Sequence, residues 1–109
     1  MFGFGFGSRK DINGYVLEAR TTEGAVLIDV RSRDEYERAH IVGTLNVPLD
    51  QLDQVRTLVP DTNTPIYVFC LSGGRSGHAL KELERMGYVD VVNAGGMNRW
   101  TGPVAKGAE

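Results

Sequence analysis

The seven residues from Cys70 to Ser76 combine the features that a reactive thiol requires. They read Cys-Leu-Ser-Gly-Gly-Arg-Ser, and Cys70 is the only cysteine among 109 residues. Gly73 and Gly74 allow the backbone to turn and to direct amide groups inward. Arg75 adds a positive charge that persists at neutral pH. Because each feature favours thiolate over thiol, the pattern predicts a nucleophile rather than a buried structural cysteine.

This loop lies between an expected strand and an expected helix. The apolar run at residues 65–69 predicts a buried strand, and residues 78–86 have the spacing of an amphipathic helix. The N-terminus of such a helix supplies unpaired N–H groups and partial positive charge. Open α/β sheets place their chemistry where strands end in this way. The sequence therefore places the thiol at the carboxyl edge of a sheet.

The rest of the chain alternates between strand and helix patterns. Unbroken apolar runs predict strands buried on both faces, as in a parallel sheet, at 25–30, 45–47, 65–69 and 89–93. Helices are expected between them, at 8–20, 34–39, 50–58 and 78–86. Ser32 is expected to cap the second helix, with Glu35 at its third position. This alternation predicts one α/β domain with a mainly parallel sheet.

The loop matches every fixed position of the C-x-x-G-x-R-S motif and so resembles the rhodanese-like family, sulfurtransferases that carry sulfur on a cysteine. Residues 29–48 follow the first long signature of that family, with Ala39 where the family usually has glycine. Residues 95–100 follow its second signature. The resemblance extends from about residue 25 to residue 100, nearly the whole domain.

The resemblance implies a rhodanese-like three-layer sandwich, in which a central, mainly parallel sheet has helices on both faces. We expect the domain to span residues 8–101. Residues 1–7, which alternate Phe and Gly, and residues 102–109 are expected to be loosely ordered termini.

The resemblance also implies the reaction and its residues. Cys70 would take a sulfur atom from a small sulfur-containing anion such as thiosulfate, or from a persulfide, and pass it to cyanide or a thiol, including a protein thiol. The substrate-binding residues would be those that follow it: Leu71, Ser72, Gly73, Gly74, Arg75 and Ser76. No metal or organic cofactor is implied.

Three positions carry further expectations. Asp29 and Arg31 would lie at the same edge of the sheet as Cys70, either biasing the charge around the loop or forming local pairs such as Arg31 with Glu35. Leu71 is aliphatic where many thiosulfate-using family members have a basic or polar residue. We therefore expect weak use of thiosulfate and a preference for a more apolar or protein-borne donor.

Two other functions are compatible with parts of the pattern. Cysteine phosphatases also use a cysteine, a ring of amides and an arginine, but with five residues between Cys and Arg; here four residues separate Cys70 from Arg75. The shorter loop favours a single sulfur atom over a phosphoryl group with its equatorial oxygens. Rhodanese-like domains also serve as non-catalytic binding or regulatory modules, often without the cysteine that this chain retains.

Composition narrows the expected partners and the expected cellular compartment. A net charge of −2 and 24% charged residues argue against nucleic acid or an acidic membrane surface as a partner. A single cysteine excludes an internal disulfide and a multi-cysteine zinc site, and it fits a reducing compartment. No apolar stretch approaches the ~20 residues that a membrane span needs, and no secretory signal pattern precedes the domain. We therefore expect a cytoplasmic protein.

Overall fold

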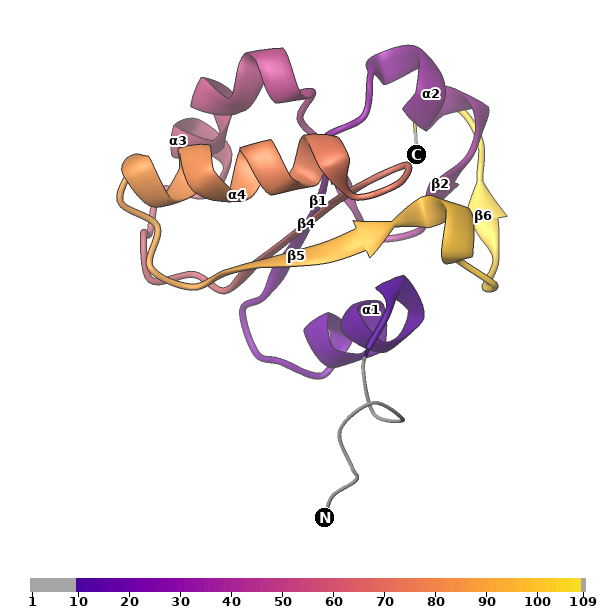
Figure 1. The fold of residues 1–109 in the computed structure, drawn as a ribbon, viewed down its shortest axis with the longest axis horizontal. Coiled ribbons are helices and arrows are strands. Elements are labelled where there is room, and N and C mark those ends of the chain that lie inside the picture. The colour runs from indigo at the N-terminus through magenta and orange to yellow at the C-terminus, as the bar shows by residue number, and fades with distance from the viewer. Residues whose placement is uncertain (1–9, 109) are drawn as a thin grey trace.

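Four parallel strands form the central sheet of the computed structural model, which describes residues 10–108. In chain order they are β1 (Val26–Asp29), β3 (Leu45–Asn46), β4 (Ile66–Cys70) and β5 (Val91–Gly96). Their order across the sheet is β3-β1-β4-β5, and every neighbouring pair is parallel (Figure 1). The expected parallel sheet is confirmed, with Cys70 as the last residue of an inner strand.

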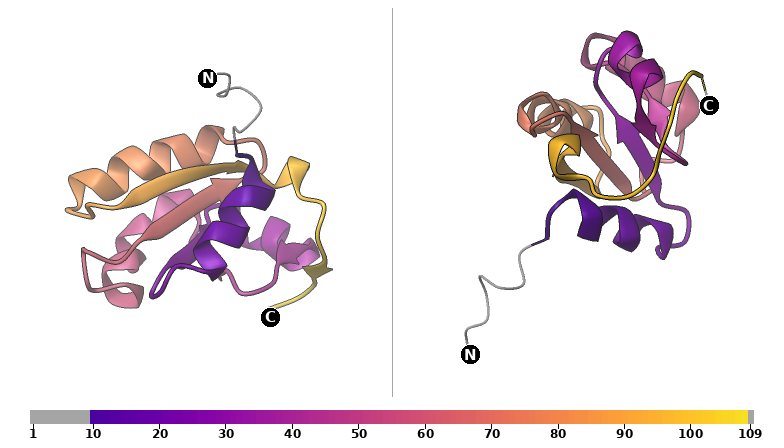
Figure 2. Two further views of the ribbon diagram at one scale, coloured as in Figure 1. Left: turned by 90° about the horizontal axis from the view of Figure 1, so that it is seen from below. Right: turned by 90° about the vertical axis from the view of Figure 1, so that its right-hand side faces the viewer.

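Helices cover both faces of this sheet, as Figures 1 and 2 show. α1 (Ile12–Arg20) lies against one face, and α4 (Gly74–Arg85) lies against the other. The same second face is covered by η2 (Leu49–Gln54) and α3 (Val55–Leu58), and α2 (Arg33–Arg38) follows the carboxyl end of β1. The three-layer sandwich predicted from the sequence is therefore confirmed.

The side chains of β4 divide between the two layers. Ile66 and Val68 belong to the apolar cluster beneath α4, whereas Tyr67 and Phe69 belong to the cluster beneath α1. All five residues of the strand are buried, as an inner strand of a parallel sheet requires. By this alternation Cys70 faces the α4 layer, where it joins the first cluster.

A second, two-stranded antiparallel ladder joins β2 (His40–Ile41) to β6 (Val104–Ala105). Gly107 N–H also donates to the carbonyl of Glu37 at 2.7 Å. Residues from 102 onward are expected to be loosely ordered, but main-chain hydrogen bonds hold residues 104–105 against the domain. Such bonds require no apolar pattern, so the sequence does not reveal them.

Two helices that precede β4 depart from expectation. α1 is capped by Asp11, whose side chain accepts from the Asn13 N–H at 3.0 Å, whereas Ser8 lies outside the described residues, as does the segment 1–7. The helix expected at 50–58 is instead η2 followed by α3, with a kink at Gln51. A short η3 (Met97–Arg99) follows β5. No helix between residues 10 and 108 combines the length and the apolar character needed to cross a membrane.

Candidate active site

Cys70 ends β4 directly below the N-terminus of α4 and is 1% exposed. Only three residues connect the strand to the helix, because Gly73 adopts a positive φ of 101° and α4 begins at Gly74. The sequence predicts a helix that begins near residue 78. The earlier start places Arg75 and Ser76 in its first turn, so their amides belong to the unpaired N–H groups of a helix N-terminus.

Polar hydrogens converge on the Cys70 sulfur. The Gly73 N–H donates to Sγ at 3.0 Å and the Ser76 N–H donates at 3.4 Å, while the Ser76 hydroxyl lies 3.4 Å from the sulfur. Burial raises the pKa of the Cys70 thiol. Hydrogen bonds from the Ser76 hydroxyl and from the amides of Ser76, Gly73 and Ser72 lower this pKa by more than burial raises it. The net result is a pKa below the ordinary value, so that thiolate forms more readily.

Arg75 departs from its expected role beside the thiolate. Its Nη1 and Nη2 donate to the two carboxylate oxygens of Glu35 at 2.7 and 3.0 Å, a bidentate pair that links α4 to α2. Within residues 10–108 the guanidinium donates to Glu35 and not to the Cys70 sulfur. Because a carboxylate balances its charge, Arg75 contributes less to thiolate stability than the sequence suggests.

Asp29 and Arg31 form a separate, buried ion pair. Arg31 Nε lies 3.0 Å from both Asp29 oxygens, and Nη2 donates to Oδ2 at 2.8 Å. Nη2 also donates to the carbonyl of Ala39 at 2.8 Å. The suggested pairing of Arg31 with Glu35 is wrong, because Asp29 occupies Arg31 and Arg75 occupies Glu35. These contacts fix the backbone after β1.

The loop that carries Cys70 is seated on η3 by close backbone contact. The Asn98 N–H donates to the Leu71 carbonyl at 3.0 Å. At Gly96 an added Cβ would lie 2.4 Å from that carbonyl oxygen and 2.7 Å from Ser72 Cα. Only glycine at position 96 allows this approach, so Gly96 supports a loop that lies earlier in the chain.

The remaining predicted site residues differ in their exposure to solvent. Leu71, Ser72 and Gly74 are exposed, Arg75 is half-buried and Ser76 is fully buried. Two contributors are not among the predicted site residues. Glu35 is the partner of Arg75, and Asn93 Oδ1 accepts a hydrogen bond from the Ser76 hydroxyl at 2.8 Å. A signal for Asn93 was present, since it is a polar residue within an apolar strand.

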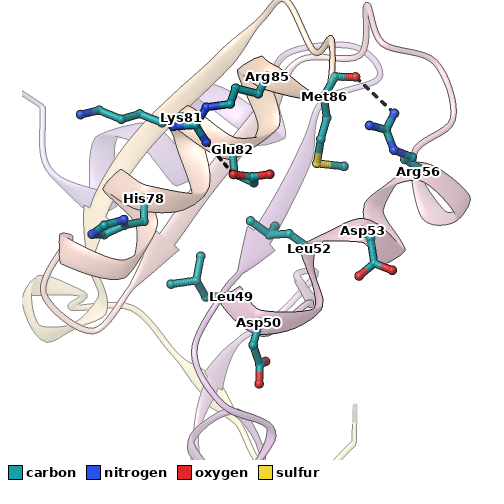
Figure 3. A pocket seen from close by; sticks show the side chains of 10 residues that line it. All are labelled: Leu49, Asp50, Leu52, Asp53, Arg56, His78, Lys81, Glu82, Arg85 and Met86. Carbon is teal, nitrogen blue, oxygen red and sulfur yellow. Dashed lines mark hydrogen bonds and ion pairs between the residues drawn. The ribbon is translucent and has the colours of Figure 1, made fainter.

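A surface groove of about 510 Å³ lies between η2 and α4 (Figure 3). Its walls carry both signs of charge, including Asp50 and Asp53 on η2 and Lys81 on α4, and Leu52 and Met86 supply apolar surface. No residue of the 70–76 loop lines the groove. The groove and the 70–76 loop are therefore separate features of the surface.

Known proteins resemble this chain both in sequence and in fold. The Rhodanese-like domain family matches residues 13–103. The chain is 41% identical to thiosulfate sulfurtransferase PspE of Escherichia coli over 81 residues, 73% of this chain and 78% of that protein. It is 35% identical to the thiosulfate:glutathione sulfurtransferase of Saccharomyces cerevisiae over 88 residues, 69% of this chain and 63% of that enzyme.

A solved structure agrees with this relationship. A rhodanese with anions from E. coli superimposes with a TM-score of 0.71 at 39% identity, covering 76% of this chain and 99% of that one. The chain therefore belongs to the rhodanese-like family of sulfurtransferases, as the three sequence signatures predict.

The pair between Arg75 and Glu35 makes a prediction about stability and pH. Hydrogen bonds from Arg75 lower the pKa of Glu35 from its ordinary 4.5 to about 2, against the opposing effect of burial. A depressed carboxyl pKa stabilises the fold above pH 4.5 and loses that effect as the pH falls towards 2. The side chains are 38% and 25% exposed, so screening leaves about 1 kcal/mol.

We expect Glu35→Gln, which preserves the capping box of α2, to lower the free energy of unfolding by about 1 kcal/mol at pH 7. The difference from wild type should shrink as the pH approaches 2. Urea unfolding at several pH values measures it. Glu37→Gln is the matched control, because its exposed pair with Arg33 on the same helix should contribute almost nothing. An equal loss in both variants, or a difference independent of pH, contradicts the account.

Proposed function

We propose that this chain moves a sulfane sulfur from a donor to an acceptor through a persulfide on Cys70. The observation that carries the proposal is a buried sulfur that accepts hydrogen bonds from the Gly73 and Ser76 amides. Such donors stabilise negative charge on sulfur in a site that excludes water. The Cys70 thiolate attacks the outer sulfur of thiosulfate, a sulfur–sulfur bond forms, and sulfite leaves with the electron pair of the broken bond.

The second half of the reaction returns the enzyme to its first state. Cyanide or an acceptor thiolate attacks the outer sulfur of the persulfide, and the Cys70 thiolate leaves with the bonding electrons. Thiocyanate or a new persulfide is the product. The related E. coli enzyme is named for thiosulfate, and the related yeast enzyme is named for thiosulfate and glutathione, which supports thiosulfate as a donor and a thiol as an acceptor.

Loop geometry favours sulfur transfer over the two alternative functions. A phosphatase loop aims its arginine at the phosphoryl oxygens, whereas Arg75 directs one N–H of each Nη group to Glu35. A purely regulatory module needs no thiol whose pKa is lowered by surrounding amides. We also propose a cytoplasmic location, because the single cysteine must remain reduced to act as a nucleophile.

The covalent step is tested with the single cysteine. Incubation with thiosulfate should make the protein heavier by one sulfur atom, and cyanide should reverse the change, as mass spectrometry of the intact chain would show. Steady-state kinetics should follow a ping-pong pattern. Cys70→Ser should lose both the mass change and the transfer activity, because a hydroxyl is a poor attacker of sulfur near neutral pH. Transfer by Cys70→Ser would refute the mechanism.

Leu71 tests which donors the loop accepts. It is 45% exposed beside the thiol, and Arg75 is balanced by Glu35, so the loop offers a dianion little net positive charge. A cation about 7 Å from thiosulfate would contribute roughly 2 kcal/mol for each unit of negative charge at an effective dielectric of 20. Screening at the wet surface should leave about 0.5–1 kcal/mol, which corresponds to a few-fold in binding.

We therefore expect Leu71→Arg to lower the KM for thiosulfate a few-fold, and more at low salt than at high salt. Leu71→Gln controls for size and polarity without charge, and an uncharged persulfide donor controls for general effects on the loop. Thermal melting should be nearly unchanged, because the replaced side chain is exposed. If Leu71→Arg melts like wild type but leaves the KM unchanged or raises it, the electrostatic argument is wrong.

A further inference from the structure

The Ser76 hydroxyl has one proton and three candidate acceptors. Its oxygen lies 2.8 Å from Asn93 Oδ1, 3.2 Å from the Gly73 carbonyl oxygen and 3.4 Å from the Cys70 sulfur. Ser76 is fully buried, so water does not compete for the proton. The direction of this one hydrogen decides whether the hydroxyl stabilises the thiolate or accepts a hydrogen bond from the neutral thiol.

Two backbone groups fix the orientation of the Asn93 amide. The Gly95 N–H can only donate, and it lies 3.0 Å from Oδ1. The Gly73 carbonyl can only accept, and it lies 3.3 Å from Nδ2. Both contacts require the same orientation, so the atom that faces Ser76 is an oxygen without a proton. The Ser76 hydroxyl must therefore donate to Asn93 whenever the short contact between them is made.

An irregularity in β5 places Asn93 at this position. Val68 pairs with Asn93 whereas Phe69 pairs with Gly95, so Ala94 is an extra residue in the strand. Such a bulge twists a strand locally and redirects the side chains beside it. Gly95 has a φ of 96°, a conformation that glycine adopts without strain. The bulge thus brings the Gly95 N–H back to Asn93 Oδ1 and turns the amide towards the start of α4.

We propose that Asn93 is a positioning residue that holds the Ser76 proton away from Cys70 while the thiol is neutral. In this state the thiol donates to Ser76 Oγ, and Ser76 donates to Asn93 Oδ1. When the thiol loses its proton, the Ser76 hydroxyl turns from Asn93 to the sulfur. Asn93 therefore opposes ionisation of Cys70, and the thiolate forms at the expense of the hydrogen bond between Ser76 and Asn93.

The same arrangement has a consequence for the Cys70 persulfide. This consequence, unlike the role of Asn93 in the free thiol, rests on the proposed function. Once the negative charge lies on the outer sulfur, the inner sulfur is neutral and no longer requires the Ser76 proton. The proton can then return to Asn93. The ionisation of the free thiol can be measured without any sulfur donor, so that the role of Asn93 can fail while sulfur transfer stands, and the reverse.

The test is the pKa of Cys70, followed through the ¹³Cβ chemical shift of the only cysteine in the chain. Asn93→Leu has nearly the same shape but no acceptor. Only the Gly73 carbonyl then competes with the sulfur for the Ser76 proton, so the Cys70 pKa should fall below that of wild type. If Asn93 only supports the loop, its loss should loosen the amides that face the sulfur, and the pKa should rise or stay the same. A fall supports the proposal, and either other result overturns it.

A double-mutant cycle isolates the path through Ser76. In a Ser76→Ala background the same Asn93→Leu change should leave the Cys70 pKa where Ser76→Ala alone puts it, because no hydroxyl proton remains to be redistributed. An equal fall in both backgrounds would overturn the proposal. Thermal melts verify folding, and Asn93→Ala, with the same expected direction, replaces Asn93→Leu if the latter does not fold.

Discussion

The structure depends on the approach of the Gly73 N–H to the buried Cys70 sulfur, a contact of 3.0 Å. It requires a strand that ends at the cysteine, a backbone that reverses at a glycine of positive φ, and a helix that begins one residue later. The strand is held by its neighbours β1 and β5, and the helix is held by the apolar cluster beneath it. The amides therefore point at the sulfur before any substrate arrives, which is the preorganisation that catalysis through charge stabilisation needs.

The arginines around the loop form ion pairs with carboxylates. Arg75 is held by Glu35 and Arg31 is held by Asp29, so neither guanidinium faces the sulfur as a free cation. The thiol is consequently tuned by backbone dipoles and one hydroxyl, which act over short distances. The exposed side chain of Leu71, directly after Cys70, adds no charge to the surface of the loop.

Most of the fold and the thiol loop could be predicted, because apolar runs and a glycine-rich turn report local geometry. The capping box of Ser32 and Glu35 was equally readable and is confirmed. The partners of the charged groups could not be predicted. Glu35 pairs with Arg75 across forty positions of the chain, and the folded packing decides which groups meet. The ladder between β2 and β6 could not be predicted because two-residue strands have no periodicity. The role of Asn93 depends on a bulge in β5 that the sequence pattern does not predict.

We expect folding itself to lower the pKa of the Cys70 thiol. This expectation has a direct test. It is tested by measuring the Cys70 pKa of one wild-type sample in the folded state and again in urea sufficient to unfold it, using the ¹³Cβ shift of the single cysteine. The account predicts a lower pKa in the folded protein, because hydrogen bonds from Ser76 and from the Gly73 and Ser72 amides outweigh burial. A folded-state pKa equal to or above the unfolded one would contradict it.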